Sequence, residues 1–165
     1  MKPLKISSSK PNPIYLKAII AGWLGLSLIG FLDATYLTIQ HYRGFGLDCG
    51  PLLECDAVMN SQYAVIGGIP LALLGTLYYL AIFLLTVAYY DRKNIYILSI
   101  TARLTILGFL VSLILAYLQA FIIRAFCSYC LLSALTSIGL FILAMIYRVK
   151  LKMGYLTDYP LSKSR

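Results

Sequence analysis

Charged side chains are scarce in this sequence of 165 residues. Asp, Glu, Lys and Arg together make up 12% of it, whereas 61% of the positions are hydrophobic and the mean hydropathy is +0.84. An ordinary soluble domain carries about twice that share of charge, so the composition excludes this class. The sequence therefore predicts one membrane domain spanning residues 1–165.

Histidine is nearly absent too, since His41 is the only one. A single histidine has no partner for haem ligation, and no haem or flavin signature is visible. An A-x-A-like cleavage site is also missing before Asp33, although lysines precede the first apolar run. We therefore expect the first helix to be retained rather than removed as a signal peptide.

The sequence does contain four long apolar stretches. We predict transmembrane helices at about residues 14–40, 70–90, 95–123 and 127–149. About 20 residues rising 1.5 Å each cross a hydrocarbon core of about 30 Å, and each stretch reaches that length. The predicted fold is thus an all-α integral membrane protein, a bundle of four transmembrane helices.

The net charge of +8 would suggest nucleic-acid binding if the basic residues were clustered. Instead they precede the first predicted helix, separate the second from the third, and follow the fourth, which leaves only Arg43 and Arg124 for the other side. By the positive-inside rule both termini are cytoplasmic. Topology therefore explains the charge, and we expect no nucleic-acid partner.

All four cysteines then fall on the non-cytoplasmic side, where disulfides form and persist. Cys49 and Cys55 lie in the first outer connection, and Cys127 and Cys130 lie in the motif "FCSYC" at the start of the fourth helix. The CxxC spacing is that of a redox dithiol or of half a zinc site. A helix N-terminus favours the thiolate form of a cysteine. Arg124 either adds to this effect or only anchors the helix end.

The first outer connection, about residues 43–69, is long enough to suggest a function. We predict a short interfacial helix in it, with Asp56 as the N-cap and a break at Gly67–Gly68 before the second transmembrane helix. Ser61 lies on this element. Taken alone, it is more simply a surface residue or a local backbone partner than a hydroxyl that points into the bundle.

Asp33 interrupts the first apolar stretch. Its distance from Lys17 along a helix places it near the outer interface, where a single carboxylate is tolerated. Polarisation of an active site is the alternative role.

One cysteine pair in a loop and a second at a membrane-embedded helix start suggest a two-step relay. The loop pair can meet a soluble protein, and the helix pair faces the lipid, where a membrane quinone is a suitable electron acceptor.

Two alternatives to the relay stay open. The first is a structural Cys₄ zinc site, although its C-x₅-C half is unusual, and the second is a structural membrane protein with two inert disulfides.

The combination of these motifs resembles the vitamin K epoxide reductase family. The resemblance rests on Cys49 and Cys55, on Ser61 six residues later, on "YAVIGGIPLALLG" leading into the second helix, and on "FCSYC". It covers roughly residues 14 to 150 and is strongest for the bacterial disulfide-forming members. Some of these carry a fused thioredoxin-like domain, which is not found in this sequence.

The resemblance implies a role for each site residue. Cys130 would engage the quinone, and Cys127 would exchange with the loop. Cys55 would be the loop cysteine that meets Cys127, and Cys49 would exchange with an external protein. Ser61 matches the family's hydroxyl near the active site, so the resemblance favours a catalytic role for it.

The resemblance also implies the partners of the reaction. The chain would be a quinone-dependent, disulfide-forming oxidoreductase that uses ubiquinone, menaquinone or a similar quinone. Its thiol partner would be a separate thioredoxin-like (DsbA-like) protein. The implied location is the bacterial inner membrane, with the cysteines facing the periplasmic or external side.

Vertebrate members hold the quinone oxygens with an Asn near the second helix and a Tyr on the fourth. This chain has Ala134 at the Tyr position and no clear Asn near Leu71, so no quinone contact is assigned.

Overall fold

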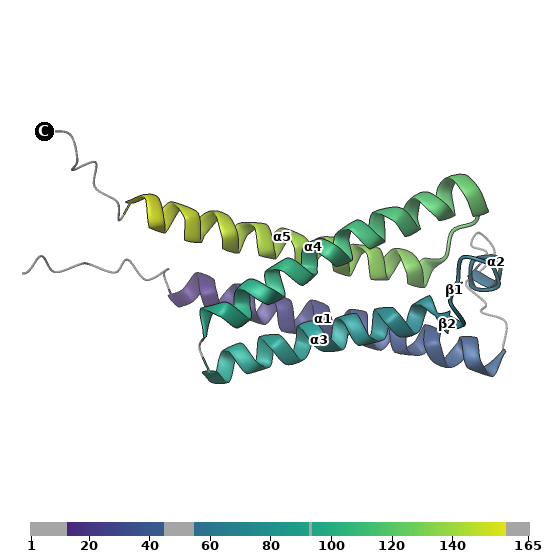
Figure 1. Ribbon diagram of the computed structural model, residues 1–165, viewed down its shortest axis with the longest axis horizontal. Coiled ribbons are helices and arrows are strands. Elements are labelled where there is room, and N and C mark those ends of the chain that lie inside the picture. The colour runs from purple at the N-terminus through teal and green to yellow at the C-terminus, as the bar shows by residue number, and fades with distance from the viewer. Residues whose placement is uncertain (1–12, 45–54, 93, 158–165) are drawn as a thin grey trace, which may run out of the picture.

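The computed structural model describes residues 13–44, 55–92 and 94–157, which form a bundle of four long helices (Figure 1). These are α1 (Pro13–Arg43), α3 (Leu71–Arg92), α4 (Ile95–Tyr117) and α5 (Ser128–Thr157), and α4 continues as the π-helix η1 (Leu118–Ile123). All four are long and apolar enough to cross a membrane. The prediction of an all-α bundle of four transmembrane helices is confirmed.

Local sequence signals account for where two of these helices begin. Pro13 is the first residue of α1, a position where its fixed φ and missing N–H are tolerated. Asn94 is the N-cap of α4, and its side-chain oxygen accepts a hydrogen bond from the backbone N–H of Tyr96 at 3.0 Å. Because so few residues separate α3 from α4, the two helices are antiparallel neighbours (Figure 1).

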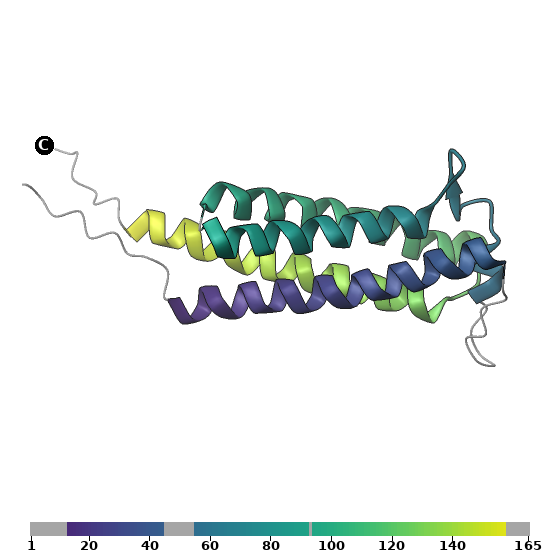
Figure 2. The same ribbon diagram turned by 90° about the horizontal axis from the view of Figure 1, so that it is seen from below.

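The helices pack in a closed arrangement around a shared interior. Both α1 and α4 contact α3 and α5 (Figures 1 and 2). We call the largest buried cluster the main core; its members include Trp23, Ile82, Leu98 and Leu140. Trp23 is fully buried, and its indole N–H donates to the carbonyl oxygen of Leu140 at 3.3 Å. This bond joins α1 to α5 inside an otherwise apolar cluster.

Tyr79 of α3 is the polar centre of the bundle. Its ring lies against Gly30 of α1, where any Cβ would collide with it, so glycine is required for this close approach. The Tyr79 hydroxyl donates to the carbonyl oxygen of Ser133 at 2.7 Å, and it lies 2.8 Å from Oγ1 of Thr136 and 3.0 Å from Oγ of Ser137. A buried hydroxyl is thereby satisfied within the membrane-spanning region.

The connection between α1 and α3 contains a shorter helix than we expected. Helix α2 (Cys55–Met59) has five residues, and residues 63–65 before the Gly67–Gly68 pair are not helical. Asp56 is not the N-cap, because the helix already begins at Cys55 and places Asp56 in its first turn. A carboxylate there still favours the helix N-terminus electrostatically.

A small β-hairpin replaces the remainder of the expected helix. Strands β1 (Val65–Ile66) and β2 (Ile69–Pro70) pair antiparallel. Gly67 and Gly68 join them with φ values of 58° and 83°. Two consecutive positive φ angles are what a tight hairpin turn needs, and glycine adopts them without steric cost. The Gly-Gly pair is therefore a hairpin turn rather than a simple helix break.

The short elements gather at one end of the bundle. Helix α2 and the hairpin lie where α1 ends and α5 begins, and the opposite end holds the start of α1 and the end of α5 (Figures 1 and 2). The CxxC motif and the connection that carries Cys55 are thus brought to the same end.

Candidate active site

Cys127 and Cys130 lie at the N-terminus of α5, and both are free thiols. The Cys127 sulfur accepts a hydrogen bond from the backbone N–H of Cys130 at 3.4 Å, and the Cys127 carbonyl accepts from the N–H of Leu131 at 3.0 Å. Cys127 therefore acts as the N-cap of the helix, with sulfur in the place of the usual oxygen. Its side chain is fully buried, whereas that of Cys130 is partly exposed.

This capping geometry makes Cys127 acidic. A hydrogen bond from the Cys130 thiol, together with the backbone N–H groups of Cys130 and Tyr129, lowers the pKa of Cys127 from 9.0 to about 7, although burial acts in the opposite direction. Roughly half of the Cys127 side chains are then thiolate at pH 7. The predicted help from Arg124 is not among the causes of this shift, and the Arg124 side chain is exposed.

Cys55 is brought next to the CxxC motif. It is the first residue of α2, is fully buried and is disulfide-bonded. Its sulfur lies 3.9 Å from the hydroxyl of Ser128, the residue after Cys127. We call the apolar cluster that holds both cysteines the outer cluster; its buried members are Leu37, Cys55, Val58, Ala125 and Cys127. Cys49 lies outside the described residues.

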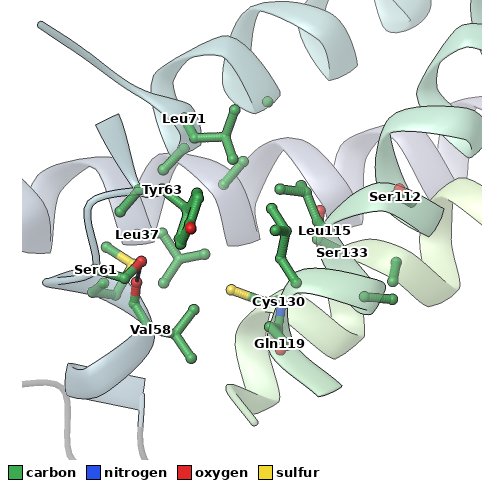
Figure 3. A pocket seen from close by; sticks show the side chains of 18 of the residues that line it. Leu37, Val58, Ser61, Tyr63, Leu71, Ser112, Leu115, Gln119, Cys130 and Ser133 are labelled. Atoms are coloured by element: carbon green, nitrogen blue, oxygen red, sulfur yellow. Dashed lines mark hydrogen bonds between the residues drawn. The ribbon is translucent and has the colours of Figure 1, made fainter. Parts of the chain in front are cut away.

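A pocket of about 130 Å³ opens beside the outer cluster (Figure 3). Its walls are mostly apolar, with Leu37, Leu71 and Leu115 among them. Its polar lining comes from His41, Ser61, Tyr63, Ser112, Gln119, Cys130 and Ser133. An apolar cavity of about 150 Å³ accommodates benzene, so this space fits a single six-membered ring. Among the described lining residues Cys130 is the one cysteine.

Ser61 lies across the pocket from Cys130 (Figure 3). Its hydroxyl donates to the carbonyl oxygen of Val58 at 2.7 Å, which closes the turn after α2. The same side chain is thus a local backbone partner and a lining residue of the pocket, and its catalytic role stays a prediction.

Gln119 is a site residue that the sequence analysis missed. It is 5% exposed, lies on η1 and lines the pocket. Its side-chain oxygen accepts a hydrogen bond from the backbone N–H of Cys127 at 3.3 Å. A signal was present, because Gln119 is the one carboxamide within the span Tyr96–Ile123, and polar residues inside membrane spans are commonly functional.

Asp33 is buried between the helices. It is 7% exposed, and neither of its carboxylate oxygens has a hydrogen-bond partner. Its charge raises the pKa of Cys127, although less than the hydrogen bonds lower it. Polarisation of the active site therefore stays a prediction for Asp33.

Ala134 also lines the pocket. A methyl group there cannot hydrogen-bond a ligand. The polar groups that face the space belong instead to residues such as Gln119 and Ser133.

Comparison with known protein families agrees with these features. The model of the vitamin K epoxide reductase family matches residues 22–145, which include all four cysteines and Ser61. No curated protein matches the chain at a significant level. Since the match covers most of the chain and all four membrane-spanning helices contribute to it, the chain is an integral membrane oxidoreductase that belongs to the vitamin K epoxide reductase family.

Proposed function

We propose that the chain is a thiol:quinone oxidoreductase that supports disulfide formation outside the cytoplasm. It takes electrons from a separate thioredoxin-like protein and passes them through two cysteine pairs to a membrane quinone. The observation that carries the proposal is that the CxxC pair joins the outer cluster to the pocket. Cys127 packs with Cys55 in the outer cluster, and Cys130 lines the pocket.

In the first step, a thiolate of the partner protein attacks a disulfide between Cys49 and Cys55. The mixed disulfide resolves when the second partner thiol attacks it, which releases the oxidised partner and leaves the loop as a dithiol. The roles within this pair follow the family resemblance. Cys55 is held beside the CxxC motif, so Cys49 is the cysteine assigned to the partner.

In the second step, the Cys55 thiolate attacks Cys127 in a Cys127–Cys130 disulfide. Cys130 leaves as a thiolate, and Cys49 then attacks Cys55, so that the loop disulfide reforms and Cys127 leaves. A thiol of low pKa leaves faster in such an exchange. The lowered pKa of Cys127, about 7, therefore suits its role as leaving group.

The CxxC dithiol then transfers its electron pair. The quinone, when bound, accepts two electrons and two protons, which are those released when the dithiol becomes a disulfide. Cys130 is assigned the contact with it, since this is the cysteine at the pocket. The structure has Cys55 disulfide-bonded and both CxxC thiols free, which is the redox state expected just before this transfer.

The same proposal fixes the orientation in the membrane. The start of α1 and the end of α5 lie at one end of the bundle (Figure 2). In the sequence, most basic residues precede the first span, lie between the second and third, or follow the fourth. By the positive-inside rule this end is cytoplasmic, and the CxxC motif faces the periplasm or exterior. We place the protein in a bacterial inner membrane.

The two alternatives have less support. A disulfide-bonded Cys55 is not available as a thiolate ligand for zinc, so a Cys₄ site would need a different redox state. Two inert disulfides do not fit a CxxC pair of free thiols in which Cys127 has a lowered pKa. Stoichiometric zinc in the purified protein, or disulfides that resist a thioredoxin-like donor, would favour one of them.

Quinone reduction by the purified protein tests the proposal. The protein is supplied with a reduced thioredoxin-like donor and a soluble quinone, and the wild type is compared with Cys130→Ala and Cys49→Ala. We expect turnover in the wild type and a loss of at least 100-fold in both variants, because each removes a thiol that no other group replaces. Equal turnover in the wild type and Cys130→Ala would contradict the relay.

A further inference from the structure

The start of α5 contains half of a capping box made from redox residues. In a capping box, the N-cap side chain accepts a hydrogen bond from the N–H of residue N3, and the N3 side chain accepts one from the N-cap N–H. Cys127 occupies the N-cap position and Cys130 occupies N3, and the first of these bonds is present at 3.4 Å. A thiol at N3 replaces the Glu or Gln that would normally make the second bond.

Gln119 supplies this second bond from outside the helix. Its carboxamide oxygen accepts from the N–H of Cys127 at 3.3 Å, so both backbone donors of the box are satisfied. The chain between them turns at Arg124, whose φ of 57° is left-handed. This reversal, directly after the π-helix η1, brings residue 127 back to the side chain of residue 119.

We propose that Gln119 is a positioning residue for Cys127. Gln119 accepts a hydrogen bond from the backbone N–H of Cys127. This bond keeps Cys127 in the N-cap position, where its sulfur accepts a hydrogen bond from the backbone N–H of Cys130. This inference rests on the proposed function, because Gln119 affects activity only if Cys127 is the thiol that exchanges with the loop. It concerns Gln119 of η1, which also lines the pocket beside Cys130 (Figure 3).

A neutral side chain can shift the ionisation of Cys127 in this way through geometry alone. The titratable residues that act on Cys127 are Cys130 and Tyr129 on its own helix and Asp33 of α1. Cys55 of α2 is disulfide-bonded, and η1 contributes no titratable side chain within Leu118–Ile123. A change at Gln119 therefore removes no charge, and any change in the ionisation of Cys127 reports a change in its hydrogen bonds.

The test is the pH dependence of alkylation. The full chain with Cys49→Ala and Cys55→Ala is reduced and treated with iodoacetamide between pH 5 and pH 10, and fragment mass spectrometry assigns the label to Cys127 or Cys130. This protein is compared with the same protein carrying Gln119→Met, which keeps the side-chain length but removes the acceptor. Gln62→Met is the matched control, because it makes the same change at an exposed position outside the pocket lining.

We expect the midpoint for Cys127 to lie near pH 7 in the parent protein and in Gln62→Met. In Gln119→Met it should rise by about one pH unit, which slows alkylation at pH 6 about tenfold, because each unit of pKa changes the thiolate fraction tenfold well below the midpoint. An unchanged midpoint in Gln119→Met would overturn the proposal.

A second variant, Gln119→Asn, tests the proposal if Gln119→Met does not fold. Gln119→Asn keeps the carboxamide and shortens it by one methylene group, so it should weaken the bond and give a smaller upward shift of the same midpoint. A Gln119→Asn protein with the parent midpoint would contradict the proposal in that case. Since no quinone or donor protein is present, the alkylation result is independent of whether the relay itself is found.

Discussion

In the main core, the side chains of Trp23, Ile82 and Leu140 fill the space between the helices, and the indole N–H found there is hydrogen-bonded. Toward α2 the same four helices enclose a pocket of about 130 Å³, two free thiols and the unpartnered carboxylate of Asp33. A protein interior is normally close-packed, and buried polar groups are normally paired. Each region contains an unpartnered polar group, the Asp33 carboxylate at the outer end and the Tyr147 hydroxyl in the main core, so the outer end is distinguished by its pocket and its free thiols. It is therefore the part of the bundle arranged for chemistry, while the main core holds the helices in register.

The sharpest way to test this comparison is to make the same substitution in both regions. Ala134→Phe fills part of the pocket, so we expect quinone turnover to fall at least tenfold with little change in the melting temperature. Ala144→Phe places the same ring in the main core, where Ala144 is 1% exposed, and should lower the free energy of unfolding by about 1–3 kcal/mol. Steady-state turnover and thermal unfolding in detergent measure the two effects.

Two results would contradict the distinction between the outer end and the main core. A large loss of stability in Ala134→Phe, or full turnover with the ring in place, would mean that the pocket is not the binding space.

A smaller effect is expected when the pH is changed. The pKa of Cys127 in the folded protein is about 7, lower than the 9.0 of an unperturbed thiol. A lowered pKa adds stability that is fully present above pH 9 and is lost as the pH falls through 7. The free energy of unfolding of the reduced protein should therefore rise by about 2 kcal/mol between pH 7 and pH 9, relative to Cys127→Ala. Denaturant titrations at several pH values measure this difference. If the free energy of unfolding changes equally with pH in both proteins, the Cys127 thiolate does not stabilise the fold.

The smallest predicted effect is at Ser61. Ser61→Ala removes the hydrogen bond to the carbonyl of Val58, which is worth about 0.5–1.5 kcal/mol. We expect turnover to fall on the order of threefold, because the turn that follows α2 and Cys55 loosens. Ser112→Ala, which changes a lining serine on α4, should have less effect because no such turn depends on it. Equal turnover in both variants would leave Ser61 with no special role.

The sequence was sufficient for the four helices because hydropathy and length decide whether a segment can span a membrane. It also identified the thiol pair and its helix N-terminus, since CxxC spacing is local. The hairpin was missed because Gly67–Gly68 can end a helix or form a turn with positive φ, and spacing alone does not separate these outcomes. The burial of Asp33 could not be read from its position along the chain, because it depends on how α1 packs against the other helices.

The bond from Cys127 to Gln119 could not have been predicted from the pattern of residues. It depends on the π-helical turns of η1 and on the left-handed Arg124, neither of which has a clear signature in the letters "LQAFIIRAF". The roles of Cys49 remain a prediction from the family resemblance. Those of Cys55, Cys127 and Cys130 also remain predictions, although their positions are consistent with a relay.

The π-helix η1 makes the number of residues between α4 and α5 important in itself. A π-helical turn accommodates one more residue than an α-helical turn, so the removal of a single residue from Leu118–Ile123 would allow an ordinary α-helix to continue. The π-helical turn and the shorter α-helical turn each close about one full rotation, so such a deletion would leave the residues after it at nearly the same rotation relative to α4. A deletion in the α-helical part of α4 has no such compensation and would rotate everything after it by about 100°. A change of one residue in length should therefore be tolerated better within η1 than elsewhere in this helix.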